Sequence, residues 1–392
     1  MTSTQTAQMT KTARFVDIHI LQDLPPSCLN RDDNGTPKQA RYGGATRLRV
    51  SSQSWKRATR LDFSQRLDRG ELGVRTRLLK GVFADALRED GLDEDQALAL
   101  AAKTVELVGY SKGPSKKASA KDEDTAEKAA PAKSQDQFGY LLFAGRRQLA
   151  ELARAVAEVP KAATLPVADL IKAIDLGQIL GSAHPLDVAL FGRMVANMSD
   201  LNVEASVQVA HAISTHAAET QFDYFTALDD EQDTADSGAG MLGTIEFNSA
   251  TMYRFASVAV DRLAENLGGG DAAEGTIRFI ESFVRSMPAG RSSTFAPRTR
   301  PSLVAVVVRS DQPVNLVSAF ETPVWSREGY MATSQERLAQ LFVEEKGRWG
   351  DDPVLEVATY TSASAGLEAA FGPSLSVPEL LSRVRAVLER DA

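Results

Sequence analysis

The order of its periodic segments is what most constrains the fold of this chain. Alternating apolar and polar residues, or short β-branched runs, indicate strands, and apolar residues spaced three or four apart indicate helices. In chain order the segments are a strand at 15–21, a helix at 51–60, strands at 205–214 and 245–260, a helix at 272–287 and a strand at 303–308. This strand-helix-strand-strand-helix-strand order predicts an α+β fold with a ferredoxin-like arrangement, the one shared by RNA-recognition (RRM-like) folds.

The first of these strands shows the alternation most clearly. Val16, Ile18 and Ile20 fall on one face, and Asp17 and His19 fall on the other. Because successive side chains of a strand point to opposite faces, we expect one face to be buried and the other to be polar and open. The sequence therefore predicts a half-buried strand.

Two insertions interrupt this order. Residues 63–200 separate the first helix from the second strand and are largely helical in pattern. The helical patterns cover 75–90, 93–108, 140–159 and 167–177. Residues 111–137 are rich in Lys, Ala, Ser and Glu without an apolar pattern, which predicts a mobile loop whose lysines either are solvated or contact nucleic acid. The second insertion, at 218–244, has an acidic tip rich in Gly and Ser, which we expect to be exposed.

Composition indicates a soluble globular protein. The chain has 392 residues, 43% of them hydrophobic and 24% charged, which suits two or three domains or one core with large insertions. The polar start does not resemble a secretory signal, and the longest apolar runs are too short to span a bilayer. The single cysteine, Cys28, is interpreted as a packed side chain rather than a nucleophile. We therefore expect a protein of the reducing cytoplasm.

A cationic segment stands out in an otherwise acidic chain. The net charge is −8, yet residues 34–61 hold seven basic residues and no acidic one. The seven are Lys38, Arg41, Arg47, Arg49, Lys56, Arg57 and Arg60. A solvated basic surface would explain them, and so would an anionic partner such as nucleic acid.

The second half of this segment predicts a helix with two different faces. Ser51 and Ser52 are common N-cap residues, and helix formers follow them. At about 100° per residue, one face offers an amide and three cations while the other can pack. The first face holds Gln53, Lys56, Arg57 and Arg60, and the second holds Trp55, Ala58 and Thr59. Because a helix N-terminus attracts anions, its start is a predicted phosphate site.

Two further segments could contact nucleic acid. A loop between the second helix and the last strand carries Arg291, Arg298 and Arg300, and it is either a phosphate contact or a plain exposed loop. In the second insertion, Tyr224 and Phe225 could stack on bases. For aromatics at this spacing, the sequence alone favours a core position over base stacking.

The sequence offers little for catalysis. His211 and His216 would face opposite sides of a strand, which is poor zinc geometry, and no CxxC or HExxH motif accompanies them. Asp229 and Asp230 could bind Mg²⁺, as could the pair that begins at Asp32, but acidic loops are usually just solvated. We therefore expect a non-catalytic binding protein without cofactor or metal. The alternative is a metal-dependent RNA-processing nuclease of the ferredoxin-like group.

Several motifs, taken in order, resemble one known family. Near the start they are Pro26-Ser-Cys-Leu-Asn-Arg-Asp-Asp33, Gly43-Gly44 and Arg49-Val-Ser-Ser-Gln-Ser-Trp-Lys-Arg57. Further along they are Gly192-Arg-Met194, Ala210-His-Ala-Ile-Ser-Thr-His216, Asp223-Tyr-Phe-Thr-Ala227, Asp229-Asp230, Gly243-Thr-Ile-Glu-Phe247, Tyr253-Arg254 and Glu265-Asn-Leu-Gly-Gly269. Across roughly residues 13–325, the chain resembles the CasC family, the backbone subunits of the type I-E CRISPR Cascade complex of antiviral defence.

The resemblance implies a fold like a right hand. The parts would be a palm at 12–62, 201–217 and 245–325, fingers at 63–200, a thumb at 218–244 and a C-terminal region at 326–392 that packs on the palm. Such subunits hold CRISPR guide RNA (crRNA) by its sugar-phosphate backbone without reading its sequence. The thumb of one subunit pushes into the RNA held by its neighbour, so that nucleotides flip out at regular intervals and the segments between pair with target DNA. The implied partners are guide RNA, target DNA through the guide, further copies in a head-to-tail filament and other Cascade subunits.

The resemblance and the basic segments together assign site residues. The predicted RNA contacts are Arg31, Lys38, Arg47, Arg49, Ser51, Gln53, Lys56, Arg57, Arg60, Arg193, Met194 and Arg291, and the predicted thumb contacts are Tyr224, Phe225 and Thr226. Arg193 and Met194 would lie near the kink in the RNA. The sequence departs from the family where Trp55 replaces a commoner aliphatic residue, Tyr224 a commoner Trp, and Ala45-Thr46 a more basic pair. The last change implies a weaker cationic strip.

Overall fold

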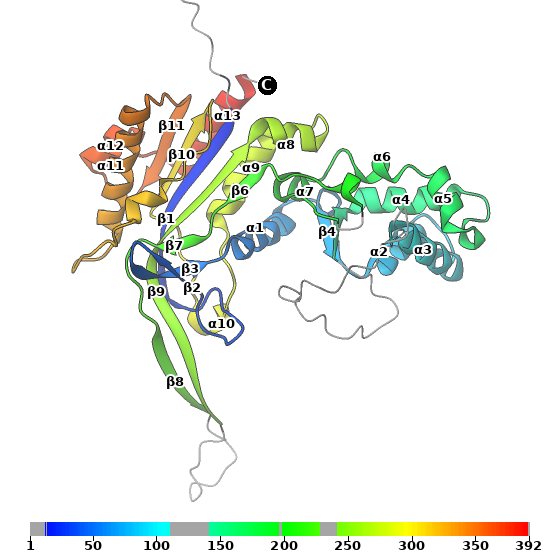
Figure 1. Cartoon of the computed structure of the whole chain (residues 1–392), viewed down its shortest axis with the longest axis horizontal. Helices are drawn as coiled ribbons and strands as arrows, with labels where there is room; N and C mark the ends of the chain where they lie inside the picture. The colour runs from blue at the N-terminus through cyan, green and yellow to red at the C-terminus, as the bar shows by residue number, and fades with distance from the viewer. Residues whose placement is uncertain (1–11, 13, 110–140, 196–197, 228–240, 391–392) are drawn as a thin grey trace, which may run out of the picture. The chain divides into compact units, whose positions relative to one another are not determined.

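The chain divides into two compact units (Figure 1). The computed structural model describes residues 12, 14–109, 141–195, 198–227 and 241–390. The sheet unit comprises Met1–Phe63, Val207–Asp261 and Ala272–Ala392, and the helical unit comprises Ser64–Ser206 and Arg262–Asp271. The predicted loop at 111–137 and the pair Asp229-Asp230 lie outside the described residues.

Among the described residues, nine strands form one antiparallel sheet in the sheet unit. They are β1 (Phe15–Ser27), β2 (Gln39–Tyr42), β3 (Ala45–Val50), β6 (Val207–Val209), β7 (Ala212–Ser214), β8 (Gln221–Ala227), β9 (Met241–Ala259), β10 (Leu303–Arg309) and β11 (Leu355–Tyr360). Hydrogen-bonded neighbours follow the order β11-β10-β1-β9-β7-β3-β2, and β6 and β8 also pair with β9. With the helices described below, this sheet confirms the predicted α+β class.

The predicted strand at 205–214 is two strands, β6 and β7, separated by a β-bulge. Val209 pairs with Ala256 of β9, whereas Ile213 pairs with Tyr253, so four steps along one strand match three along the other. The extra residue falls in the stretch that contains His211. A bulge changes the direction of the side chains that it carries, so His211 does not follow the alternation that the sequence suggested.

β1 is buried on both faces, so the prediction of a half-buried strand was wrong. Asp17 and His19 are 0% exposed, as are Val16, Ile18 and Ile20 on the other face. The polar face is covered by apolar residues from helices that follow β10 in the chain. The covering residues include Leu316, Phe320, Leu338, Phe342 and Leu367.

Asp17 and His19 of β1 each have hydrogen-bond partners inside the fold. Asp17 Oδ2 accepts hydrogen bonds from Arg309 Nε and from the N–H of Val314, both at 2.9 Å. His19 Nδ1 and the hydroxyl of Tyr253 are hydrogen-bonded at 2.9 Å. Pairing of this kind makes burial of polar side chains tolerable, which the alternation pattern does not reveal.

Helices cover both faces of the sheet. Those of the sheet unit are α1 (Ser52–Arg66, which continues past Phe63), α9 (Ala272–Arg285), α10 (Ser292–Phe295), η4 (Leu316–Phe320), α11 (Met331–Trp349), α12 (Ala365–Phe371) and α13 (Val377–Arg390). α1 and α9 correspond to the predicted helices at 51–60 and 272–287. α11 and β11 were not predicted. α11 supplies part of the second covering layer, and β11 extends the sheet beside β10.

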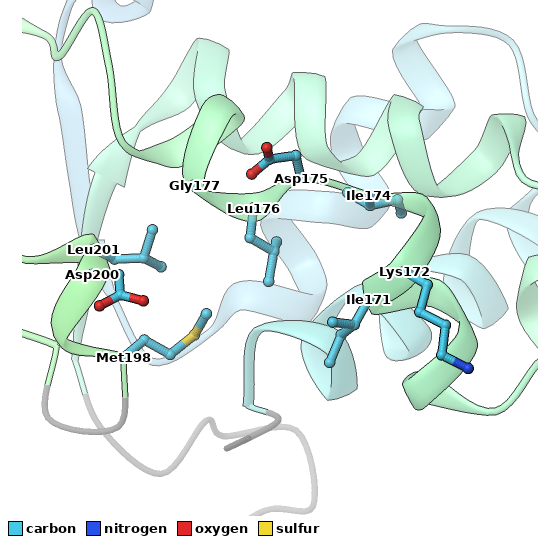
Figure 2. A pocket seen from close by; sticks show the side chains of 9 residues that line it. All are labelled: Ile171, Lys172, Ile174, Asp175, Leu176, Gly177, Met198, Asp200 and Leu201. Atoms are coloured by element: carbon cyan, nitrogen blue, oxygen red, sulfur yellow. The ribbon is translucent and has the colours of Figure 1, made fainter. Parts of the chain in front are cut away.

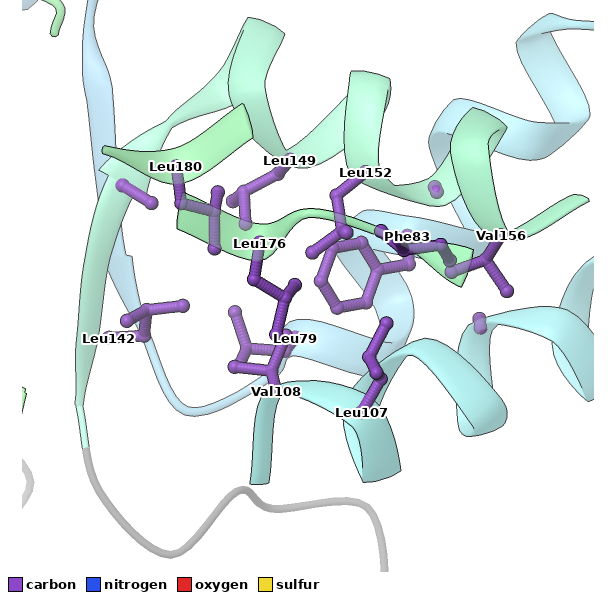
Figure 3. Close-up of a cluster of buried hydrophobic side chains, with 14 of the residues drawn as sticks. Leu79, Phe83, Leu107, Val108, Leu142, Leu149, Leu152, Val156, Leu176 and Leu180 are labelled. Carbon is purple, nitrogen blue, oxygen red and sulfur yellow. The ribbon is translucent and has the colours of Figure 1, made fainter. Parts of the chain in front are cut away.

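The helical unit has its own apolar core (Figure 3). Its elements are η1 (Arg69–Glu71), β4 (Gly73–Thr76), α2 (Leu79–Glu89), α3 (Glu94–Gly109), β5 (Leu142–Gly145), α4 (Arg146–Glu158), η2 (Ala162–Thr164), α5 (Val167–Ala173), α6 (Leu176–Leu180), α7 (Leu186–Phe191), η3 (Ser199–Leu201) and most of α8 (Val260–Leu267). The core joins α2, α3, α4 and α6 through Phe83, Leu107, Leu152 and Leu176. No helix in the described parts of the chain has the length and apolar character needed to cross a bilayer.

The predicted helix at 93–108 is confirmed as α3, whereas the other three predicted helices of this unit differ from expectation. Those at 75–90 and 140–159 each begin with a strand, and the two strands, β4 and β5, pair with each other. Gly145 ends β5 and is the N-cap of α4, and its N–H donates to Gln148 Oε1 at 3.0 Å. The predicted helix at 167–177 is broken into α5 and α6 at Asp175, whose carboxylate caps α6 by accepting the N–H of Gln178.

A two-stranded ribbon extends from the sheet (Figure 1). β8 pairs with the first part of β9, from Gln221 opposite Phe247 to Ala227 opposite Met241. β9 then continues from Asn248 as the partner of β1. One strand of the ribbon is therefore continuous with a central strand of the sheet, which fixes the direction in which the ribbon leaves the sheet.

Candidate nucleic-acid interface

α1 begins at a hydrogen-bonded cap. The Ser51 hydroxyl accepts the N–H of Ser54 at 3.3 Å, and the N–H of Ser51 donates to Asn30 Oδ1 at 2.8 Å. Ser51 is 5% exposed, so its oxygen serves the helix rather than solvent. The feature left for an anion is the helix N-terminus, with its backbone N–H groups and positive dipole end.

The two predicted faces of α1 are confirmed. Its buried residues are Trp55, Ala58, Thr59 and Phe63. On the opposite side, Gln53 and Arg57 are exposed, and Lys56 and Arg60 are half-buried. Burial lowers the pKa of Lys56 from its ordinary value. The outer face of α1 therefore carries an amide and three cationic side chains.

A buried arginine anchors the inner face of α1. Cζ of Arg254, on β9, lies 3.8 Å from the ring centroid of Trp55 and 4.5 Å from that of Phe283 on α9. Arg254 donates to Gln22 Oε1 at 2.6 Å and to the carbonyl oxygen of Phe283. Burial lowers the pKa of Arg254 to about 9. Sequence reasoning missed this contact, and its one signal was the unusual Trp55.

The loop before β2 is tied to the start of α1. Asn30, which bonds Ser51 through its side chain, accepts the N–H of Lys38 through its carbonyl oxygen at 2.8 Å. The Asp32 carboxylate accepts two backbone N–H groups of its own turn, at 2.9 and 3.0 Å. Asp32 is therefore part of the turn, and the exposed Arg31 lies in a loop fixed to the helix start.

A hollow of about 440 Å³ lies beside this loop. It is lined by Leu29, Asn30, Arg31, Asp32, Asp33, Gly35 and Gly290. A Cβ on Gly290 would lie 2.3 Å from the carbonyl oxygen of Leu29, so only glycine allows this approach. Burial raises the pKa of the Cys28 thiol, and Arg291 and Arg31 partly oppose that rise. Two basic residues from distant parts of the chain therefore lie near one point.

Arg49 and His211 meet beside Lys38. Arg49 Nη1 donates to His211 Nδ1 at 3.2 Å, and Arg49 Nε donates to the carbonyl oxygen of Gln39 at 3.1 Å. Burial lowers the pKa of His211, and the charges of Arg49 and Lys38 lower it further. His211 was not among the predicted site residues.

Arg47 does not lie on the surface, so its assignment as an RNA contact is corrected. It is 0% exposed. Its guanidinium donates to four carbonyl oxygens, those of Tyr42 (3.2 Å), Ser214 (3.0 Å), Phe320 (2.7 Å) and Glu321 (3.2 Å). η4 and Glu321, the residue after it, cover this part of β3. The local sequence around Arg47 does not predict this burial, because η4 lies far away in the chain. Arg47 therefore holds β3, β7 and η4 together.

Arg193 is also internal, and its assignment is corrected in the same way. It is 5% exposed and donates to the carbonyl oxygens of Leu201 and Leu180, both at 2.7 Å. Burial lowers its pKa to about 10. The neighbouring Met194, in contrast, is 83% exposed. The motif that holds both residues therefore offers a methionine, not a cation, at the surface of the helical unit.

The β8–β9 ribbon carries exposed aromatic side chains. Phe222 and Tyr224 are 67% and 64% exposed, and Thr226 is also exposed. Phe225 is half-buried and faces its own hairpin, since a Cβ on Gly243 would lie 2.4 Å from its ring. The sequence analysis singled out Tyr224 and Phe225 and missed Phe222.

The two histidines considered as zinc ligands, His211 and His216, have different surroundings. His216 is buried and stacks on Tyr330 with ring centroids 3.7 Å apart, whereas His211 is exposed and bonded to Arg49. Within the described ranges, no group of three or more His, Cys, Asp or Glu residues is placed to hold a metal ion.

A second hollow, of about 480 Å³, belongs to the helical unit (Figure 2). It is lined by Ile171, Lys172, Ile174, Asp175, Leu176, Gly177, Met198, Asp200 and Leu201. Its charged groups have local partners: Lys172 pairs with Asp169 at 3.0 Å, and Asp175 caps α6. This hollow contains no residue of the predicted RNA-contact set.

Comparisons place the chain among known proteins. The family described as CT1975-like protein matches residues 16–382. A chain of a solved structure described as "CRISPR RNA-guided surveillance complex, pre-nicking" is 34% identical with a TM-score of 0.81, and the match covers 95% of this chain and 100% of that one. A chain of a structure described as "CRISPR RNA-guided surveillance complex" is 30% identical with a TM-score of 0.68, covering 95% and 99%. A search of curated proteins finds no match.

Proposed function

Because the chain belongs to the CT1975-like protein family, we propose that it is a non-catalytic backbone subunit of the CasC kind in a type I-E CRISPR Cascade complex. Two similar chains from structures described as CRISPR RNA-guided surveillance complexes support this proposal. Its partners are guide RNA, target DNA through that guide, further copies of itself and the other subunits. It acts in the cytoplasm, which suits a chain with a single cysteine.

The sheet unit is the proposed ferredoxin-like palm. The neighbour order β10-β1-β9-β7 supports it, because α1 and α9 lie between these strands in the order that the ferredoxin-like arrangement requires. The helical unit is the proposed set of fingers, and the β8–β9 ribbon is the proposed thumb.

The single observation that carries RNA binding is the two-sided nature of α1. Its inner face is anchored by Trp55 and Arg254, so its outer cations are held in a fixed arrangement. Its N-terminus lies in contact with the loop that carries Arg31 and Lys38. Cations and N–H groups recognise phosphate, which is the same in every nucleotide, so this surface binds the RNA backbone irrespective of sequence.

The test is the double substitution Lys56→Ala with Arg57→Ala. Both charges lie on the outer face of α1, so RNA affinity should fall to a similar extent for unrelated sequences. The slope of log affinity against log salt should become shallower by about 1.4, the value for two contacts to single-stranded phosphates. Fluorescence anisotropy with labelled single-stranded RNA over a salt series measures both quantities.

A matched control removes two exposed charges elsewhere on the sheet unit. Arg383→Ala with Arg390→Ala, on α13, lowers the net charge equally and should leave both affinity and salt slope close to those of the unchanged protein. Equal losses in the two double variants would mean that only net charge matters. A loss confined to one RNA sequence would indicate base reading and contradict the proposed function.

The non-catalytic role has its own test. The protein is incubated with labelled RNA and DNA in the presence of Mg²⁺ or Mn²⁺, and the nucleic acids should stay intact. Reproducible cleavage that disappears after Asp229→Ala with Asp230→Ala would instead support the nuclease alternative.

A further inference from the structure

His211 is the one exposed histidine of the chain. The protein has four histidines, all within the described residues. His19, His184 and His216 are 0%, 7% and 5% exposed, whereas His211 is open to solvent. A histidine is the side chain whose ordinary pKa lies near neutral pH. Among the histidines, a response of ligand binding to mild acid is therefore expected from His211.

The bulge between β6 and β7 fixes where His211 lies. The N–H of Ala210 donates to the carbonyl oxygen of Phe255 at 3.0 Å, which holds the bulge on β9. His211 then reaches Arg49 on β3, and its Nδ1 accepts a hydrogen bond from that guanidinium. Since Nδ1 is an acceptor, this hydrogen bond assigns the proton of the neutral ring to Nε2. The exposed ring can therefore donate from Nε2 to an incoming oxygen.

We propose that His211, Lys38 and Arg49 form one phosphate-binding group, and that His211 takes up a proton when RNA occupies it. This inference rests on the proposed RNA-binding function and adds to it a binding residue and a response to pH. Arg49 is held by Gln39 O as well as by His211, so the group is organised before RNA arrives.

The charges around His211 give the direction of the response. In the free protein, burial lowers the pKa of His211, and Arg49 of β3 and Lys38 of the preceding loop lower it further. These are the charged groups that act on it from the neighbouring segments. A phosphate bound among them offsets both cations, which favours the imidazolium. On protonation Nδ1 becomes a donor and no longer accepts from Arg49, so Arg49 Nη1 turns to the phosphate while Arg49 Nε stays on the carbonyl oxygen of Gln39. The pKa is then higher in the complex than in the free protein, so affinity rises as pH falls through that higher value.

The experiment compares RNA affinity at about pH 6 and about pH 8 for the full-length protein and for His211→Gln. Each unit of difference between free and bound pKa corresponds to about a tenfold change in affinity, so binding should tighten about three- to tenfold at the lower pH. His211→Gln keeps a donor but cannot be charged, so its affinity should change little with pH. Gln208→Ala, at an exposed position of β6, should behave like the unchanged protein. NMR titration of the His211 ring, with and without the RNA, measures its pKa directly.

The outcomes separate the two proposals. If Lys56→Ala with Arg57→Ala weakens binding but His211→Gln keeps the full pH response, His211 does not take part and only this inference fails. An unchanged His211 pKa in the complex would overturn it as well. If the α1 double variant binds RNA as tightly as the unchanged protein, the proposed function itself fails.

Discussion

At the scale of single residues, the main finding is that arginines of this chain have two distinct uses. Arg57 and Arg31 lie at the surface, whereas Arg47, Arg193 and Arg254 are buried and donate to oxygens inside the protein. A guanidinium has five N–H donors, so it can join several carbonyl groups that would otherwise lack partners. A count of basic residues therefore overestimates the charge that is available to RNA.

Arg47→Ala should destabilise the sheet unit without acting directly on RNA. The substitution leaves four carbonyl oxygens without this donor, and those of Ser214 and Phe320 are buried, so we expect a loss of about 2–4 kcal/mol in the free energy of unfolding. Urea unfolding measures it. Arg41→Ala, at an exposed position of β2, is the control and should cost less than about 0.5 kcal/mol. A stable Arg47→Ala protein with weak RNA binding would show that Arg47 contacts RNA after all.

His184 should make the helical unit sensitive to acid. Burial lowers its pKa to about 4, with a further contribution from Arg193. Because the folded pKa lies below the unfolded value of 6.5, the contribution to stability is complete above pH 6.5 and is lost as pH falls through about 4. The free energy of opening measured by hydrogen exchange at the α4 amides should therefore fall over this range, by up to about 3 kcal/mol. His184→Gln should flatten the dependence, and an equally steep curve would contradict the assignment.

At the scale of elements, α1 and the β8–β9 ribbon follow the same plan. Each has one side fixed by internal packing and another that is open to a partner. On α1 the fixed side is Trp55 against Arg254, and on the ribbon it is Phe225 against Gly243. The open sides differ in chemistry, since α1 offers cations and the ribbon offers Phe222 and Tyr224. This difference suits phosphate for the helix and flat apolar groups for the ribbon.

Substitutions in the ribbon should affect assembly and folding separately. Phe222→Ala with Tyr224→Ala removes exposed rings, so the free energy of unfolding should change by less than about 0.5 kcal/mol while RNA-dependent assembly weakens. Phe225→Ala removes a packed ring and should lower the stability of the hairpin itself. Analytical ultracentrifugation with RNA and thermal unfolding without it measure the two effects. If the double variant assembles normally, the ribbon is not the contact between copies.

At the scale of the whole molecule, the charge distribution bears on self-association. The net charge of −8 coexists with a cationic segment at 34–61. Like charges repel, so an acidic protein resists contact with its own copies until an anionic strand joins their basic regions. If the ribbon of one copy binds the sheet unit of the next, the interface joins two different surfaces and is heterologous. Interfaces of this kind build filaments rather than closed dimers.

RNA should therefore drive assembly. Without RNA at low salt, the protein should sediment as a small species. With single-stranded RNA longer than one binding site, larger species should form in steps that follow RNA length. Assembly to the same size with and without RNA would contradict this account of the charge.

The local sequence determined the order in which β1, α1, β9, α9 and β10 follow one another, the two faces of α1 and the motifs that connect the chain to its relatives. These features depend on residues a few positions apart, whose periodicity directly reflects which side of an element is buried. Only the tertiary structure decided that Arg47 is covered by η4, that Arg254 stacks on Trp55 and that His211 meets Arg49. Each of these contacts joins segments more than 150 positions apart in the chain, and their closeness is set by how the sheet pairs its strands.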